Sequence, residues 1–320
     1  MQTLTARQNL KTDTPRVVSF EPSHSWLKRH DDEGTLIIQA GYVSNPNGRI
    51  NKDDENPLVV DGAMRRWYGM RACEADHISP LYTRKENTAK DSFKACLRST
   101  DHGKDLHVVV SHWDEDTARE MARVLKGAYH VVRNGIEIQC NVVDATPELE
   151  GIGAYYLCRP FLKEGKTLLI EIGHGTSEEW LIDETGFPAG SATEQLAVNS
   201  LVTRIANDQE IKAACLHLGE QQANHDLITR ALKTGTIGTI PLERWEAIKG
   251  RHVREWYDSL KGYVLKRHGS TLQNTANIIF SGGGAALVES RLRQFAIVPE
   301  NPQTASVRGC YEHYSRVING

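Results

Sequence analysis

Three apolar runs in this chain each end directly in a turn of small and polar residues. The three segments are VVSFEPSHSWLK (17–28), LLIEIGHGTS (168–177) and NIIFSGGGAALV (277–288). A buried strand that ends in such a turn can point several backbone N–H groups at one bound anion. A single turn of this kind more often serves as a plain connection, so the constraint on the fold comes from finding three of them.

Length and composition predict a globular protein of two domains. The chain has 320 residues, of which 39% are hydrophobic and 25% are charged, and a domain usually takes about 100–200 residues. The net charge of -3 gives no electrostatic case for wrapping nucleic acid. The chain has no apolar run of about 18 residues and no signal peptide, so we expect a cytoplasmic protein without a membrane span.

The first half of the chain reads as strands with few helices. Strands are predicted at 16–20, at 35–43, on both sides of Asp61-Gly62 and at 105–113, where a helix over 114–127 follows. Asn134-Gly135 joins two alternating runs and predicts a type I′ hairpin. Thr146 as N-cap and Pro147 at the first position predict a helix over TPELEGIGAYYLCRP.

The second half restarts with strands and then becomes helical. Strands are predicted at 167–172 and in EWLIDE, with a loop in TGFPAGSA and mostly helix from Thr193 to about His268. A strand is predicted over 276–288 with a helix from Ala286, and a short strand near Ile297 and a terminal helix after Pro302 follow. The aromatic residues between 242 and 268 are expected to be core. The pattern is α/β, with a boundary near 160–167.

Two familiar nucleotide motifs fail on inspection. EGKT (164–167) looks like the end of a P-loop, but Pro160 stands where that motif needs glycine, and the segment precedes a strand. GIGAYY (151–156) begins like a dinucleotide fingerprint, but Tyr156 occupies the third glycine position. Neither segment is expected to bind phosphate.

In their order and spacing, the three turns resemble the actin-like ATPase superfamily. There, two Asp-x-Gly phosphate loops lie in opposing domains, and a Gly-Gly turn holds the adenosine. The matching residues are Glu21, Ser23 and Lys28 in the first loop, and Glu171, Gly173, Gly175 and Thr176 in the second.

The resemblance is nearest to the bacterial ParM/StbA-like plasmid-segregation proteins. PELEGIGAYYL is similar to their connecting helix, and Glu150 matches the residue that faces the γ-phosphate and orients water. TASVRGCYEHY is similar to their closing segment. The implied fold class is α/β, an actin-like ATPase fold with two related, ribonuclease H-like domains flanking a nucleotide cleft. The implied domains are a flexible tail (1–16), domain I (17–165, with the C-terminal helix 302–320) and domain II (166–301).

The resemblance also implies a binding site for Mg²⁺ and ATP, with GTP as an alternative nucleotide. Glu150 is the expected catalytic residue, and Glu21 and Glu171 are expected to hold Mg²⁺ through water. The expected nucleotide-binding residues lie in the three turns: Ser23, His24, Ser25, Lys28, Gly173, His174, Gly175, Thr176, Gly282, Gly283 and Gly284.

The chain departs from the family pattern at both metal positions, because Glu21 and Glu171 stand where the family has aspartate. Glutamate keeps the charge and the hard oxygen ligands that Mg²⁺ accepts, but it moves the carboxylate outward by about 1.5 Å. Ser23 also replaces a loop glycine. Because a misplacement of about 1 Å can cost about a hundredfold in rate, nucleotide binding is expected to survive more readily than fast hydrolysis.

As function, the resemblance implies a protein that polymerises into filaments with Mg-ATP for plasmid DNA segregation, with hydrolysis driving disassembly. Its partners would be further copies of itself and a DNA-binding adaptor, with plasmid DNA contacted indirectly. Two alternatives stay open: a nucleotide-binding filament or scaffold protein with little or no hydrolysis, and a small-molecule kinase of the same superfold. No sugar-binding signature lies between the two phosphate loops.

Overall fold

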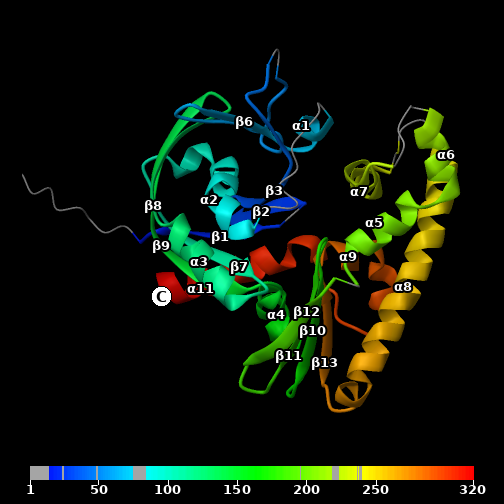
Figure 1. Ribbon diagram of the computed structural model, residues 1–320. Helices are drawn as coiled ribbons and strands as arrows, with labels where there is room; N and C mark the ends of the chain where they lie inside the picture. The colour runs from blue at the N-terminus through cyan, green and yellow to red at the C-terminus, as the bar shows by residue number, and fades with distance from the viewer. Residues whose placement is uncertain are drawn as a thin grey trace, which may run out of the picture.

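The computed structural model describes residues 14–23, 25–47, 50–74, 84–194, 196–217, 223–235, 237 and 240–320. Within these residues the chain forms two β-sheets with helices packed around them (Figure 1). One sheet has nine strands in the order β3-β2-β1-β7-β9-β8-β5-β6-β4, and the other has four in the order β12-β11-β10-β13. We call the two parts of the molecule the large-sheet lobe and the small-sheet lobe.

The large-sheet lobe contains most of the first half of the chain. Its parallel centre consists of β1, β7 and β9, and the hairpin strands β2 and β3 extend it on one side. The strands are β1 (Arg16–Pro22), β2 (Trp26–Asp31), β3 (Gly34–Gln39), β4 (Tyr42–Ser44), β5 (Leu58–Asp61), β6 (Met64–Tyr68), β7 (Asp105–His112), β8 (Gly127–Arg133) and β9 (Ile136–Leu149). The helices are α1 (Met70–Glu74), α2 (Lys85–Cys96), η2 (Ser99–Asp101) and α3 (Glu115–Leu125).

The small-sheet lobe has its own apolar core between its sheet and its helices. Its strands are β10 (Thr167–Ile172), β11 (Ser177–Ile182), β12 (Pro188–Thr193) and β13 (Asn277–Ser281). Its helices are α5 (Val198–Ala206), α6 (Gln209–His217), α7 (His225–Thr234), α8 (Leu242–Leu272), α9 (Gly282–Leu287) and α10 (Glu289–Leu292). Trp245 and Trp256 of α8 are buried in this core, which confirms the expectation for the aromatic stripe.

Two helical segments connect the lobes. α4 (Ile152–Cys158) and η3 (Arg159–Phe161) lead from β9 to β10, and η4 (Pro302–Thr304) and α11 (Ala305–Asn319) return the chain to the large-sheet lobe. α11 packs against α4 and β1 (Figure 1). We keep 17–165 with 302–320, and 166–301, as the proposed domain boundaries. No helix in the described part of the chain is long and apolar enough to cross a membrane.

Several local predictions are confirmed. Asn134 and Gly135 have positive φ angles of 57° and 89°, as a type I′ turn requires, and they join β8 to β9. α3 begins after Asp114, whose carboxylate accepts a hydrogen bond of 2.8 Å from the N–H of Thr117. Both strands around Asp61-Gly62 are present as β5 and β6.

The helix predicted from Thr146 is wrong. Thr146 to Leu149 instead continue β9, in parallel register with β7 as far as the pair His112 and Leu149. α4 starts only at Ile152, because Gly151 has a φ of 90° and interrupts the right-handed path. The tertiary pairing therefore overrides a capping signal that is locally sound.

Three further boundaries differ from expectation. Residues 35–43 form two strands, because β3 pairs with β2 whereas β4 turns away to pair with β6. The predicted loop TGFPAGSA contains edge strand β12, whose first residue, Pro188, fits because an edge position needs no N–H donor. α9 begins at Gly282 and not at Ala286.

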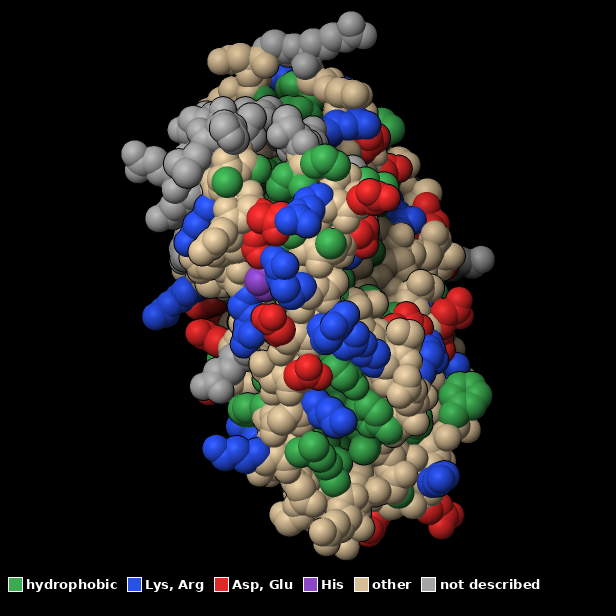
Figure 2. All heavy atoms as spheres, turned by 90° about the vertical axis from the view of Figure 1, so that its right-hand side faces the viewer, with side chains coloured by type: hydrophobic (Ala, Val, Ile, Leu, Met, Phe, Trp, Pro, Cys, Tyr) green, Lys and Arg blue, Asp and Glu red, His purple; other side chains and the backbone are tan. Residues whose placement is uncertain are grey.

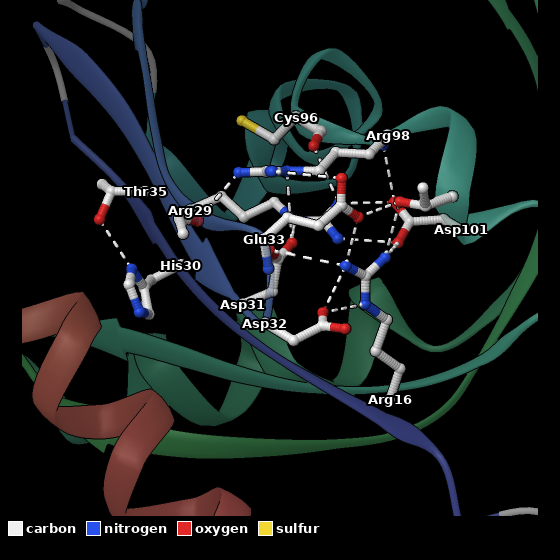
Figure 3. Close-up of polar contacts among 12 residues, drawn as sticks. Arg16, Arg29, His30, Asp31, Asp32, Glu33, Thr35, Cys96, Arg98 and Asp101 are labelled. Atoms are coloured by element: carbon white, nitrogen blue, oxygen red, sulfur yellow. Dashed lines mark hydrogen bonds and ion pairs between the residues drawn. The ribbon is translucent and has the colours of Figure 1, made fainter.

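A network of arginine ion pairs ties the β2 end of the large sheet to the turn before β7 (Figure 3). Arg29 is fully buried and donates to Asp31 at 2.6 Å and to both carboxylate oxygens of Asp101 at 2.6 and 2.8 Å. Arg16 donates to Asp101 at 2.8 Å. The acidic run Asp31, Asp32 and Glu33 could by spacing hold a cation, but Arg16 pairs with all three of its carboxylates. The network thus fixes the hairpin that carries the first polar turn.

Two glycines let α4 and α11 cross with their backbones in contact. A Cβ atom on Gly153 would lie 1.8 Å from the carbonyl oxygen of Ser306, and a Cβ atom on Gly309 would lie 1.7 Å from that of Gly153. No side chain larger than hydrogen fits at either position. The glycines of GIGAYY and of RGCYEHY therefore serve the junction between the lobes.

We predict that Gly309→Ala destabilises the protein by about 3 kcal/mol or more, because the methyl group forces the two helices apart. The melting temperature, measured by circular dichroism, should fall by roughly 6 °C or more for lobes of this size. Gly250→Ala is the matched control, since Gly250 is exposed on α8 with no atom near its missing Cβ. That change should raise stability by about 0.5–1 kcal/mol. Equal melting temperatures for both variants would contradict the backbone contact.

Candidate functional site

A cavity of about 220 Å³ lies between the two lobes, where the polar turns meet. It opens between the ends of β1 and β10 on one side and α7 and α9 on the other. Its lining residues come from both lobes: Glu21, Ser23, Trp26, Lys28, Glu150, Glu171, Gly173, His174, Val198, Thr229, Leu232, Lys233, Gly283, Ala286, Leu287 and Gln303. Eight of the expected site residues are among them.

The first turn places a carboxylate and a lysine side by side. Glu21 near the end of β1 lies opposite Lys28 of β2 in the antiparallel register, and the ammonium group of Lys28 donates to Oε1 of Glu21. Glu21 is 1% exposed and Lys28 is 6% exposed. Glu21 Oε2 has no hydrogen-bond partner among the described residues. This oxygen is therefore available to a further ligand.

Ser23 closes the first turn on itself. Its hydroxyl oxygen accepts a hydrogen bond of 3.0 Å from the N–H of Trp26, and its own N–H donates to the Trp26 carbonyl at 3.1 Å. Ser25 is buried, and its carbonyl accepts from the N–H of Ala40. His24, also expected in the site, lies outside the described residues. The Ser23 side chain thus stabilises the turn through a hydrogen bond that a glycine could not make.

The second turn is anchored to the start of α5. The carbonyl of Gly173 accepts from Val198 N–H at 3.0 Å, and that of His174 accepts from Asn199 N–H at 2.8 Å. A Cβ atom on Gly173 would lie 2.6 Å from the carbonyl oxygen of Thr176, so the turn requires glycine there. Gly173 and His174 line the cavity, whereas Gly175 does not.

The three glycines of the third turn have two different roles, close packing and lining of the cavity. A Cβ atom on Gly282 would lie 2.4 Å from the Ile172 carbonyl oxygen, and one on Gly284 would lie 2.2 Å from Ile172 Cγ2. These two glycines let α9 pack against the end of β10. Gly283 lines the cavity, and a Cβ atom there would meet only the side chain of Gln303, at 3.9 Å.

Glu150 enters the cleft from the junction between the lobes. Its N–H donates to the His112 carbonyl at 3.1 Å, and its carbonyl accepts from the Trp180 indole at 2.9 Å. The next residue, Gly151, passes so close to Glu171 that a Cβ atom would lie 3.0 Å from Glu171 Cβ. Glu150 is 4% exposed. The end of β9 therefore brings this carboxylate beside the second turn.

Sequence reasoning missed Glu178, which is fully buried in β11. It lies directly opposite Glu171 in the β10–β11 hairpin, so the two side chains point to the same face of the sheet. Oε1 of Glu178 accepts from the Thr176 hydroxyl at 2.6 Å, and Oε2 has no partner within the described part of the chain. The hairpin register could have revealed Glu178. Residues 173–176 form the whole turn, so Ile172 pairs with Ser177 and Glu171 with Glu178.

A contact across the cleft was also missed. The ammonium group of Lys233 on α7 lies 4.5 Å from the ring centroid of Trp26 on β2, a cation–π contact between the two lobes. No local pattern marks Lys233, since the contact joins residues far apart in the sequence.

Burial dominates the electrostatics of the site. Four buried glutamates (Glu21, Glu150, Glu171 and Glu178) share the cleft region with few lysines. Burial raises the pKa of Glu171 to about 8, and the charge of Glu21 adds to the rise whereas Lys28 opposes it. Burial and the charge of Glu150 likewise raise the pKa of Glu178.

This donor set suits a divalent cation held through water. Glu21 and Glu178 each present one carboxylate oxygen without a hydrogen-bond partner in the described structure. Within the same residues, no three cleft carboxylates offer ligand atoms within 4.8 Å of one another. Mg²⁺ prefers oxygen ligands and usually keeps several of its waters. Such an ion would fit here as a hydrated ion and not as one bound directly by three carboxylates.

We predict that Glu171→Gln reduces the pH dependence of stability in protein without added metal or nucleotide. The folded-state pKa of Glu171, about 8, lies above the ordinary value of 4.5. Its contribution to stability is therefore fully present below about pH 4.5 and is lost as the pH rises through about 8.

Glutamine imitates the protonated acid, so the variant should be more stable than the unaltered protein by roughly 2–4 kcal/mol at alkaline pH and nearly equal at acid pH. Thermal unfolding between pH 5 and pH 9 measures this difference. Glu184→Gln, at an exposed position between β11 and β12, is the control and should leave the slope unchanged. Parallel curves for Glu171→Gln and the unaltered protein would rule out a raised pKa.

No model of a known protein family matches the chain, and neither does any curated protein. Solved structures do match it over nearly its whole length. An archaeal actin homolog in complex with ADP has a TM-score of 0.75 at 17% identity, covering 94% of this chain and 99% of that one. A 15-stranded ParM filament from Clostridium botulinum gives a TM-score of 0.73 at 13% identity, covering 95% of this chain and 100% of that one.

Bacillus thuringiensis ParM with ATP is also similar, with a TM-score of 0.65 at 15% identity over 96% of this chain and 100% of that one. Likeness at these identities establishes the fold. The resemblance seen in the sequence motifs is thereby confirmed at the level of structure: this chain has the α/β actin-like fold that ParM and an archaeal actin homolog share.

Proposed function

We propose that this protein binds Mg-ATP in the cleft between its lobes and polymerises into filaments whose turnover depends on ATP hydrolysis. The observation that carries the proposal is the convergence of Glu21, Lys28, Glu150 and Glu171 in one cavity. These residues come from β1, β2, the junction after β9, and β10. Residues 17–28 and 168–177 are the segments that the motifs predict as phosphate loops.

The cleft residues suggest a division of roles. Lys28 would contact phosphate oxygens, with N–H groups of the polar turns beside it. Glu21 and Glu171 would hold waters of the Mg²⁺ ion, which when bound neutralises phosphate charge. Glu150 would orient the attacking water and accept its proton. Gly283 offers a surface without a side chain, against which the nucleoside could lie.

Filament formation is supported by likeness to structures described as filaments. One is the ParM filament from Clostridium botulinum, and another is the Alp12 filament. We propose that filaments of this chain move plasmid DNA in the cytoplasm through a DNA-binding adaptor. On the face that carries α8, basic and acidic side chains are interspersed (Figure 2). This one face therefore presents no continuous basic surface of the kind that binds DNA directly.

The second candidate is a filament or scaffold protein with little or no hydrolysis. It is favoured by the glutamates at positions 21 and 171, because their longer side chains displace the carboxylates relative to aspartate. A small-molecule kinase of the same superfold is the third candidate, and it would need an acceptor molecule.

One experiment separates these candidates. Purified protein is mixed with Mg-ATP while light scattering and phosphate release are recorded, and the products are viewed by electron microscopy. We expect ordered filaments together with phosphate release. Filaments without phosphate release would support the scaffold, and the absence of both filaments and nucleotide binding would overturn the proposal. Phosphate transfer that required an added acceptor would support the kinase.

We predict that Glu150→Gln leaves ATP binding and assembly intact and slows phosphate release by about 10²–10⁴-fold, the usual contribution of a general base. Binding of a fluorescent ATP analogue and single-turnover phosphate release measure the two effects separately. Glu148→Gln is a control two residues earlier, where the carboxylate instead accepts from Tyr156 and Tyr314. If Glu150→Gln lost ATP binding while bound ATP was hydrolysed normally, the role of Glu150 would be wrong.

A further inference from the structure

We propose that Lys85 is the positioning residue for Glu150, holding its carboxylate in the orientation that water activation needs. This inference rests on the proposed hydrolysis, and it adds a residue to the site that neither the polar turns nor the cavity lining includes. It also makes the start of α2 part of the hydrolytic machinery.

Lys85 is the first residue of α2 and reaches Glu150 from a distant part of the sequence. Its ammonium group lies 3.2 Å from Oε2 of Glu150 in a hydrogen-bonded ion pair. The two side chains are 10% and 6% exposed, so water screens the pair only weakly. Among the described residues, no other side chain is hydrogen bonded to the Glu150 carboxylate.

The other contacts of Glu150 hold its main chain and do not orient its carboxylate. The His112 carbonyl and the Trp180 indole hold the main chain of Glu150, at 3.1 and 2.9 Å. Neither contact restrains the side-chain torsions of Glu150. The ion pair with Lys85 is thus the interaction that selects one position for the carboxylate.

Helix stability gives no reason for a lysine at this position. The N-terminus of a helix carries partial positive charge, which disfavours a cation in the first turn. Lys94 has the usual placement in the last turn of the same helix, where it pairs with Asp61 at 2.6 Å and Asp91 at 2.9 Å. Lys85 instead sits at the unfavourable end with its side chain nearly buried. A residue that breaks a local rule in this way is expected where function demands it.

The charges around the cleft point the same way. Lys28 is already paired with Glu21, so Lys85 is the cation in direct contact with Glu150. Burial alone would raise the pKa of Glu150, but the nearby charges, with that of Lys85 first among them, hold it below the ordinary value. The direct ion pair with Lys85 therefore favours the ionised form of Glu150 that a general base needs.

The test compares five variants of the full-length protein with Mg-ATP as substrate. Lys85→Met keeps the length of the side chain and removes its charge, and Lys85→Arg keeps the charge. Lys94→Met is the matched control, because Lys94 lies on the same helix with a similar exposure of 12% and pairs with acids outside the cleft. Glu150→Gln and the double variant Lys85→Met/Glu150→Gln complete the set. Single-turnover phosphate release, ATP affinity and thermal unfolding are measured for each.

We expect Lys85→Met to slow phosphate release by about a hundredfold, the scale of a displaced general base, with ATP affinity changed less than about threefold. Lys85→Arg should recover most of the rate, and Lys94→Met should match the unaltered protein. In the Glu150→Gln background, Lys85→Met should slow release no further, because Lys85 acts through Glu150.

Three results would overturn the assignment. Lys85→Met could release phosphate at the unaltered rate, or it could slow release by the same factor with and without Glu150. Lys85→Met could also lose both ATP binding and phosphate release. The same double loss in Lys94→Met would show that any damage to α2 has this effect. If the unaltered protein binds ATP and releases no phosphate, the proposed hydrolysis fails and this inference fails with it. The first three results leave the proposed hydrolysis standing.

Discussion

The backbone contact between Gly153 and Gly309 is the constraint on which the cleft depends. α4 carries the chain from one lobe to the other, and α11 lies across it and against β1. Glu150 precedes this crossing by three residues, and the first turn follows β1. Because the two backbones are in direct contact at this crossing, separating the helices would shift Glu150 and the first turn relative to each other. Gly153 and Gly309 thus set the distance between Glu150 and the charged residues of the first turn.

The cleft gathers more buried carboxylate than buried ammonium, and this imbalance governs its chemistry. A buried carboxylate must find a cation, a proton or a hydrogen-bond donor. In this protein Glu21 has Lys28, Glu150 has Lys85, and Glu171 accepts from the Ser281 hydroxyl. Glu178 has only the Thr176 hydroxyl on one of its oxygens. The excess of carboxylate therefore suits the site to a cation, such as a hydrated Mg²⁺ ion.

The sequence predicted those parts of the site that depend on residues close together in the chain. An apolar strand followed by a polar turn is visible in a single stretch, and the Asn134-Gly135 hairpin is equally local. Thr146 and Pro147 misled because a parallel neighbour, β7, keeps them in a strand, and no local signal reports that neighbour. Lys85 and Lys233 were missed for the same reason, since each meets its partner only after the chain has folded. The sequence motifs and the fold agree in order, whereas the side-chain pairs that complete the cleft arise from tertiary contacts.

The return of α11 to the first strand has a consequence for the order in which the protein can form during synthesis. The small-sheet lobe is continuous in the chain, from β10 to Val298, so its core can close as soon as those residues have left the ribosome. One face of the large sheet is completed later, because Val17 and Val109 pack against Cys310 and its neighbours on α11. The side of β1 and β7 that carries Val17 and Val109 is therefore covered only after α11 has been made.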